Sequence, residues 1–424
     1  SVPAAGGVGA VPAPRQLAEA LASTPRVVID TPRLKGSINL VGARLDDLLL
    51  KDYRETVDSS SPLVRLLSPS GTADAEFAGF GWTGADAPPA DARWTASSDR
   101  LTPEQPVTLS WAGADGVTFE LLLQVDRDFL FTVEQRVRNG GAKPVAVRGF
   151  GFVNQTGIGA DDGRFNLHVG PIAVLGDSLM EGDIGYKKLR DKGSITVPST
   201  GGWLGITDAH WLTALIPDQK ARIEGRFTAA GADRYQVDWL QPAMTVAPGQ
   251  AVVTTSHLFA GAKEVKLLKE VRDQLSAPLF DRALAWGWFW FIAQPIFALL
   301  EWLYGIFGNY ALAIVGLTLV VRGVLFPLAN KQYASMAKMR IFAPKMKEIQ
   351  AKYKDDKQKQ QAELMGLYKR EKINPLAGCL PILLQVPIFY ALYKTLLITV
   401  EIRHQPGFLW IKDLSGPDPL TPVN

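Results

Sequence analysis

The sequence predicts a mixed architecture, in which a large antiparallel β-sandwich is followed by an α-helical membrane region with a helical hairpin. Three observations carry this prediction. Short alternating strands, separated by Gly, Pro, Asn and Asp turns, fill residues 25–269. Two apolar segments, at residues 310–328 and 380–400, are each long enough to cross the roughly 30 Å hydrocarbon core of a bilayer. A strongly basic insert separates these two segments.

The composition excludes several classes of site. The 424 residues are 47% hydrophobic and have a mean hydropathy of +0.05, which is high for a wholly soluble protein. Cys379 is the only cysteine, so neither a disulfide framework nor a cysteine-based metal site is expected. The four histidines show no ligand spacing, and no G-x-x-x-x-G-K-[ST] nucleotide loop is present. We therefore predict no cofactor. Because no signal peptide begins the chain, we expect an upstream anchor or signal.

The N-terminal part is predicted to be a linker and then the β domain. Residues 1–24 are too poor in large apolar side chains to pack, which predicts a flexible linker. Within residues 25–269, the segments 117–125 and 251–259 are apolar strand candidates. Residues 129–138 alternate, with one face formed by Phe129, Phe131, Val133 and Val137 and the other by Leu130, Glu134, Arg136 and Arg138.

The β domain also contains groups that could perform acid–base chemistry, namely Glu181, Asp208, His210 and His257. Their spacing matches no catalytic pattern. We therefore interpret them as isolated polar residues in turns and on strands, and we predict that the protein is not an enzyme.

Residues 270–309 are predicted to hold a linker and an interfacial amphipathic helix. The stretch at 283–304 is nearly long enough to span a bilayer, but it is crowded with tryptophan, carries Gln294 and Glu301 on one helical face, and contains Pro295. Tryptophan enrichment marks the headgroup level of a membrane. If this stretch spanned the bilayer, the basic insert would lie outside the cell, so we place it along the outer leaflet.

Arg322 is the one residue of the span at 310–328 that does not suit lipid. A central arginine costs about 2.5–3.5 kcal/mol on insertion scales, whereas the apolar side chains around it contribute roughly −3 to −7 kcal/mol. The segment is therefore still expected to span. From position alone, two readings of Arg322 stay open: its side chain extends to the cytosolic headgroups, or it faces a wet cavity inside the protein.

The insert at residues 329–374 is predicted to be a cytosolic helical hairpin. Between residues 331 and 372, 12 basic residues stand against 5 acidic ones, and such charge stays on the cytosolic side. Apolar residues at three- and four-residue steps, many of them methionine, favour contact with a protein or lipid over simple charge bias. The tip falls near residues 353–356, where Asp355 and Asp356 either dock a partner or form a solvated turn.

The second span is predicted at residues 375–400, followed at 401–424 by an amphipathic segment at the outer interface. Pro375, Pro381 and Pro387 break backbone hydrogen bonds, which membrane helices tolerate where neighbouring helices satisfy the freed carbonyls. Lys394 is expected to extend its ammonium to the outer surface. Two spans make a poor bundle, so the chain is expected to be a fragment of a larger membrane protein.

Several motifs resemble those of the bacterial YidC family of membrane protein insertases. They are LVVRGVLFPL at 319–328, QYASMAKMR at 332–340, NPLAGC at 374–379, QVPIF at 385–389 and LWIKDLS at 409–415. The β domain resembles the large periplasmic domain of Gram-negative members, with weaker motifs such as GWLG at 202–205. This resemblance implies a mutarotase-like supersandwich and six membrane helices, of which this chain holds the second and third. The first helix would precede Ser1, and the last three would follow Asn424.

The resemblance also implies a function and site residues. Arg322 and Thr318 match positions that line a hydrophilic groove open to the cytosol and to lipid. Residues Val386, Pro387, Ile388 and Phe389 match a region that touches the passing substrate helix. The implied partners are nascent membrane proteins and membrane lipid, with the Sec translocon, the ribosome and the signal recognition particle pathway as further candidates; no specific nucleic-acid site is expected. The implied location is the bacterial inner membrane, with the large domain in the periplasm.

Two alternatives compete with an insertase. The mutarotase-like fold would also suit a membrane-tethered periplasmic domain that binds or modifies carbohydrate. A simple anchor, however, has no use for Arg322 or for a basic hairpin. A transporter subunit should show paired broken helices and internal repeats, and neither is visible in the sequence.

Overall fold

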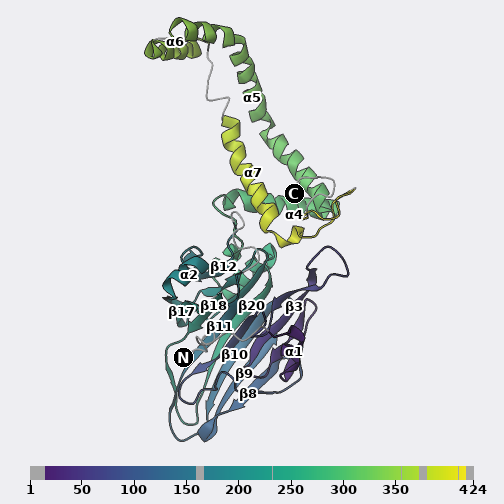
Figure 1. Cartoon of the computed structure of the whole chain (residues 1–424), viewed down its shortest axis with the longest axis vertical. Coiled ribbons are helices and arrows are strands. Elements are labelled where there is room, and N and C mark those ends of the chain that lie inside the picture. The colour runs from purple at the N-terminus through teal and green to yellow at the C-terminus, as the bar shows by residue number, and fades with distance from the viewer. Residues whose placement is uncertain are drawn as a thin grey trace. The chain divides into compact units, whose positions relative to one another are not determined.

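The computed structural model describes residues 15–158, 167–231, 233–354, 356–371, 380–408 and 410–416. It divides into two compact units, which are drawn together in Figure 1. The first unit comprises Ser1–Ala285 with Ile398–Glu401, and the second comprises Trp286–Leu397 with Ile402–Asn424. The first is mainly β and the second is α-helical, so the predicted mixed fold class is confirmed.

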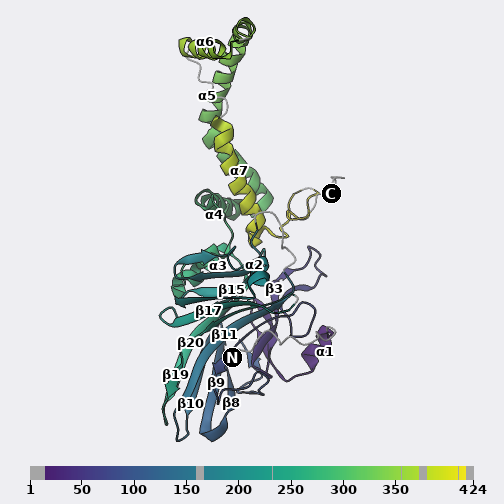
Figure 2. The ribbon, with the colours of Figure 1, turned by 60° about the vertical axis from the view of Figure 1, so that its left-hand side comes forward.

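Two mainly antiparallel sheets form the first unit (Figure 2). The 11-stranded sheet contains β1 (Arg26–Asp30), β2 (Leu34–Asn39), β3 (Arg44–Arg54), β4 (Leu63–Leu67), β5 (Glu76–Thr83), β7 (Arg100–Leu101), β11 (Val145–Thr156), β14 (Ser194–Thr200), β17 (Arg222–Ala229), β18 (Arg234–Leu240) and β19 (Met244–Val246). The nine-stranded sheet contains β6 (Thr95–Ala96), β8 (Val107–Ala112), β9 (Val117–Val125), β10 (Leu130–Asn139), β12 (Gly170–Leu175), β13 (Ser178–Met180), β15 (Trp203–Thr207), β16 (Trp211–Ile216) and β20 (Ala251–Ala262).

The strand orders explain how distant segments meet. The larger sheet runs β14-β17-β18-β11-β5-β3-β2-β1-β7, with β19 beside β11 and β4 beside β3. The smaller sheet runs β13-β12-β15-β16-β20-β10-β9-β8-β6. Among the paired strands described, only β1 and β7 run parallel. The predicted antiparallel sandwich is therefore confirmed.

The alternation in the sequence predicts the faces of the strands well. β9 occupies the predicted residues 117–125. Along β10, Phe131, Val133 and Val137 are buried, while Arg138 is exposed. The structure adds Gln135, which is buried between the sheets and donates from Nε2 to the Gly81 carbonyl at 2.8 Å. The amide satisfies a backbone oxygen of the opposite sheet, so a polar residue takes an apolar register position.

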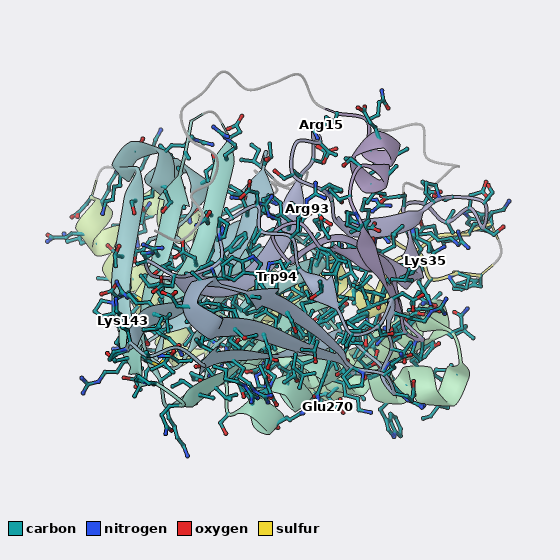
Figure 3. The ribbon with its side chains drawn as sticks, turned by 90° about the horizontal axis from the view of Figure 1, so that it is seen from below. Arg15, Lys35, Arg93, Trp94, Lys143 and Glu270 are labelled. Atoms are coloured by element: carbon teal, nitrogen blue, oxygen red, sulfur yellow. The ribbon has the colours of Figure 1, made fainter. Side chains whose placement is uncertain are left out.

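The core lies between the two sheets. Trp82 of β5 and Phe119 of β9 meet edge to face across it, with ring centroids 5.2 Å apart. Figure 3 views the chain from below, with charged residues such as Lys143 and Glu270 toward the rim and the buried Trp94 nearer the middle. Close approach requires glycine at Gly261 of β20, because a Cβ there would lie 2.1 Å from Cγ of Phe129.

Short helices complete the first unit: α1 (Leu17–Ala22), η1 (Ala114–Gly116), α2 (Tyr186–Lys192), α3 (Val265–Leu275) and η2 (Phe280–Ala283). The segment 1–24, which the sequence predicts as a flexible linker, thus includes a helical turn. Its residues 17–22, LAEALA, favour a helix, and Ala20 is buried. At the start of α3, Arg33 pairs with Glu264 and with Asp52 and Asp128, the latter two at 2.5 and 3.1 Å.

The second unit contains α4 (Trp290–Phe307), α5 (Tyr310–Lys352), α6 (Lys357–Arg370) and α7 (Leu380–Ile398), and η4 (Val400–Ile402) follows α7. The 43 residues of α5 form one helix about 65 Å long, without a break between the segments 310–328 and 329–374. α6 folds back on α5, where Gln360 Nε2 donates to the Gln350 carbonyl at 2.9 Å. The predicted helical hairpin is therefore confirmed.

Two described helices have the length and composition to cross a membrane, Trp290–Phe307 and Tyr310–Pro327. The described apolar part of α7, Gln385–Ile398, is shorter. Both ribbon views show α4 lying across the direction of α5 and α7 (Figures 1 and 2).

Candidate functional site

Helix α5 carries the predicted site residues Thr318 and Arg322. The helix starts at Tyr310, where the Asn309 side chain caps it by accepting from Leu312 N at 3.1 Å. From there it continues without interruption past Arg322. Residues four apart lie on one face of a helix with Cβ atoms about 5–6 Å apart, so Thr318 and Arg322 are neighbours.

Arg322 is an exposed charge on an apolar surface. Around it on α5, the side chains of Leu319, Val324 and Phe326 are 68%, 74% and 66% exposed. Thr318 is also exposed, and its hydroxyl donates to the Ile314 carbonyl at 2.9 Å, which satisfies the hydroxyl within the helix. Among the described residues, none forms a hydrogen bond or an ion pair with Arg322.

The buried side chains that the structure describes on α5 lie in its first two turns, next to α4, and α6 contacts the helix near its other end. Tyr310 stacks on Tyr304 with ring centroids 3.9 Å apart, and its hydroxyl donates to Glu301 Oε1 at 2.6 Å. The buried residues of α5 are Tyr310, Ala311, Ala313 and Leu317. Beyond Leu317, every α5 side chain that the structure describes is exposed or half-buried. One end of α5 is thus packed against protein, and Arg322 lies beyond that end, where the described side chains are exposed or half-buried.

Helix α7 shows the same asymmetry. Near its middle, Val386 and Phe389 are exposed, while Pro387 and Ile388 are half-buried. Toward its C-terminal end it packs on α4 and the residues before it. Tyr390 meets Phe289, just before α4, edge to face with centroids 5.6 Å apart, and the Thr395 hydroxyl donates to the Ala293 carbonyl of α4 at 3.4 Å.

Lys394 differs from its predicted position. Instead of extending to the surface, it is only 2% exposed, and its Cε lies 3.4 Å from where a Cβ on Gly287 would be. Gly287 has φ +72°, in the left-handed region that favours glycine. The connector before α4 therefore covers the lysine, a long-range contact that hydropathy does not reveal.

The hairpin tip gives one predicted residue a structural role. Asp356 is the N-cap of α6, and its carboxylate accepts from Lys359 N at 3.0 Å. Asp355 lies outside the described residues. Docking of a partner at this tip stays a prediction.

The structure also reveals contacts that the sequence reasoning missed. His404 Nδ1 lies 2.8 Å from Asp413 Oδ2, and the Ser415 hydroxyl donates to the other oxygen of Asp413 at 2.7 Å. The Asn309 amide donates to the carbonyls of Pro406 and Gly407 at 3.3 and 3.4 Å. Asparagine before an apolar helix is a capping signal, but nothing in the sequence indicates its second set of partners.

The acid–base groups of the β domain do not form a metal site. The part of the chain that the structure describes contains no group of three or more His, Cys, Asp or Glu residues placed to hold a metal ion. Burial lowers the pKa of His257, and burial raises the pKa of Glu76 to about 7. Glu76 bridges the sheets, because the Thr213 hydroxyl donates to it at 2.7 Å.

Family models match nearly the whole described chain. The model for the YidC periplasmic domain matches residues 26–299, and the model for the 60Kd inner membrane protein matches residues 302–423. The membrane protein insertase YidC of Rhizobium etli is 47% identical over 100% of this chain and 73% of its own length. That of Zymomonas mobilis is 46% identical over 96% of this chain and 71% of its own length.

Solved structures give matches with lower identity. A crystal structure of an active YidC insertase is 19% identical, covers 92% of this chain and 76% of its own, and has a TM-score of 0.34. A protein designated an aldose 1-epimerase from Escherichia coli K12 is 11% identical over 55% of this chain and 98% of its own, also with a TM-score of 0.34. The family models and the relatives with nearly half their residues identical decide the assignment, and the chain belongs to the YidC family of membrane protein insertases.

Proposed function

We propose that α5 and α7 of this inner-membrane insertase form part of a hydrophilic groove, in which Arg322 attracts the polar or acidic tail of an incoming membrane protein. The observation that carries the proposal is an exposed guanidinium on an apolar helix. Arg322 lies 12 residues after Tyr310, or roughly 18 Å along the helix axis. If the span begins at Tyr310, that depth would put the charge inside the hydrocarbon core rather than at either surface.

The groove would lower the electrostatic cost of moving a tail across the bilayer. An acidic residue in lipid costs about 2.5–3.5 kcal/mol on insertion scales. A wet cavity holding one positive charge removes part of that cost, and Thr318 adds a hydroxyl on the same face of α5. Val386, Pro387, Ile388 and Phe389 would then contact the apolar span of the substrate as it leaves toward lipid. This mechanism breaks no bond and uses no nucleotide.

The packing supports a groove closed on one side only. The N-terminal turns of α5 and the C-terminal turns of α7 are packed next to α4, whereas Arg322, Val386 and Phe389 lie beyond these turns and are exposed. The positive insert fits the cytosolic side, so α4 would lie on the periplasmic side. The transverse direction of α4 and the 91% exposure of Trp288 support its placement along the outer leaflet.

The remaining domain and partner assignments belong to the same proposal. Residues 310–328 and 375–400 would span the membrane, the hairpin at 329–374 would lie in the cytosol, and 401–424 would lie at the periplasmic surface. The exposed basic side chains of the hairpin suit anionic lipid, the ribosome or the signal recognition particle pathway, with the Sec translocon as a further partner.

Substrates with matched tails test the central claim. We expect Arg322→Ala to reduce insertion of a substrate with acidic residues in its tail more than that of the neutral variant, because only the acidic tail uses the charge. Arg340→Ala removes an exposed charge from the same helix outside the span and serves as the control. Equal losses for both tails would exclude electrostatic attraction. Photo-crosslinkers at Thr318 and Phe389 should capture a stalled nascent chain.

A further inference from the structure

The segment after α7 folds into a closed loop, described at residues 402–408 and 410–416. Two backbone hydrogen bonds tie its halves together. Gly407 N donates to the Ile411 carbonyl, and Leu414 N donates to the Gln405 carbonyl, both at 3.0 Å. Residues before and after the turn therefore lie side by side.

Three side chains lock the base of this loop. His404 Nδ1 is 2.8 Å from Asp413 Oδ2, and His404 N donates to the Ser415 hydroxyl at 3.1 Å. Burial alone would raise the pKa of Asp413. Hydrogen bonds from Ser415 and His404 nevertheless hold this pKa below its usual range, so the carboxylate stays an acceptor. His404 has φ 57°, and a non-glycine residue keeps this left-handed conformation only where its surroundings fix it.

The Asn309 side chain attaches the loop to the start of α5. Asn309 Oδ1 accepts from Leu312 N at 3.1 Å and so caps α5. Its Nδ2 donates to the Pro406 and Gly407 carbonyls, at 3.3 and 3.4 Å. A single amide therefore serves both the first turn of α5 and the loop that continues from α7. Helix α4 also links the two helices, because it contacts α5 through Tyr310 and α7 through Thr395.

We infer that Asn309 and the lock of His404, Asp413 and Ser415 form a brace that fixes the spacing of α5 and α7 at the end next to α4. Their role is to position the helices that carry Arg322 and Phe389. The expected effect of the brace on insertion rests on the proposed groove. The effect of the brace on the spacing of α5 and α7 does not. With the brace lost, α4 still joins the helices, so the effect is a wider spread of spacings rather than unfolding.

Matched substitutions separate the brace from ordinary helix capping. Asn309→Asp keeps an acceptor for Leu312 N, and therefore the cap, but cannot donate to the two carbonyls. His404→Gly keeps the left-handed backbone and loses the donor. His404→Asn keeps the left-handed backbone and a donor to Asp413, because asparagine tolerates that conformation and carries a short amide donor.

The readout is the distance between two spin labels in the full-length protein in nanodiscs. The labels are attached at Leu319→Cys on α5 and Tyr393→Cys on α7, which are both exposed sites. Cys379→Ser in the same protein prevents labelling of the native cysteine. We expect Asn309→Asp and His404→Gly to increase the population of widened spacings about three- to tenfold, the range for one lost hydrogen bond. His404→Asn should match the wild type. Insertion of a model substrate should fall in the first two variants in proportion to the population that each shifts from the normal to the widened spacing.

The outcomes distinguish the brace from the groove. An unchanged distance distribution in both Asn309→Asp and His404→Gly overturns the brace, whatever Arg322→Ala does. A widened distribution with normal insertion overturns its positioning role. Arg322→Ala should leave the distance distribution unchanged. If that variant also leaves insertion unchanged, the proposed groove is wrong, but the measured spacing still supports the brace.

Discussion

The two units of this protein treat apolar and charged side chains in opposite ways. In the β unit, large apolar residues are buried and buried charges have partners, as in Asp238, which pairs with Arg226 at 2.7 Å. In the helical unit, apolar side chains beyond Leu317 face outward, and none of the described residues pairs with Arg322. The β unit completes its own burial, whereas the helical unit leaves a surface suited to lipid and to further protein.

The largest expected effect tests this contrast with one type of substitution in each unit. Phe259 is fully buried, and its ring centroid lies 6.2 Å from that of Phe129 and 5.6 Å from that of Phe280. We expect Phe259→Ala to lower the free energy of unfolding of the β unit by about 3–5 kcal/mol, because it removes a large buried side chain and leaves a cavity. Urea unfolding followed by tryptophan fluorescence measures this loss.

Val324→Ala is the matched substitution on α5, where the side chain is 74% exposed. We expect a change in stability within about 0.5 kcal/mol, as for other exposed positions. A loss as large as that of Phe259→Ala would mean that Val324 packs against protein, and the contrast between the units would then be wrong.

A buried carboxyl gives the β unit a pH dependence that sharpens the contrast. Burial raises the pKa of Glu76 to about 7 in the folded state, against about 4.5 when unfolded. The folded state therefore binds the proton more tightly, and this stabilisation is complete below about pH 4.5 and is lost as the pH rises toward 7. We expect Glu76→Gln to remove this decline and to be more stable than the wild type above pH 7 by about 1–3 kcal/mol. Thermal unfolding between pH 4.5 and 8 measures it.

The difference between wild type and variant isolates Glu76, because Asp46 and Asp238 also have pKa values raised by burial and remain in both proteins. Parallel curves for the two proteins across this range would show that Glu76 does not titrate between the sheets. Insertion activity should not follow this curve, since Glu76 lies in the β unit.

Local patterns predicted the elements that obey them. The apolar strand candidate at 117–125 matches β9, and the apolar residues at three- and four-residue steps in the insert match the helices of the hairpin. Elements that depend on distant partners escaped prediction. Gln135 fills an apolar position because a carbonyl of the opposite sheet accepts its amide. Lys394 is covered by a connector more than a hundred residues earlier in the chain, near Gly287.

The candidate site shows the same division. Arg322 stands out in the sequence because a charge in an apolar run is costly, so it could be chosen as a candidate site residue without the structure. The brace at Asn309 could not be found in this way, because its partners Pro406 and Gly407 lie 97 and 98 residues further along and use only backbone oxygens. A backbone acceptor leaves no trace in residue type.

The smallest expected effect probes the one packed end of the helical unit. Tyr310→Phe removes the hydroxyl that donates to Glu301 but keeps the ring stacked on Tyr304. We expect the opening of the α4–α5 turn to become easier by about 0.5–1.5 kcal/mol, the net value of one hydrogen bond. Amide hydrogen exchange at residues 305–317 should rise accordingly, and exchange in β10 and β20 should not change.

The extent of the change along α5 decides how the two units differ. If packing is confined to the α4 end, faster exchange should stop near Leu317, because no described α5 side chain beyond it is buried. Faster exchange that continues through Arg322 would show that the whole helix responds as one packed body. In that case the conformation of α5 around Arg322 would itself depend on the α4 contact. The exposure of Arg322 could then no longer be explained by a part of α5 that is independent of its packed end.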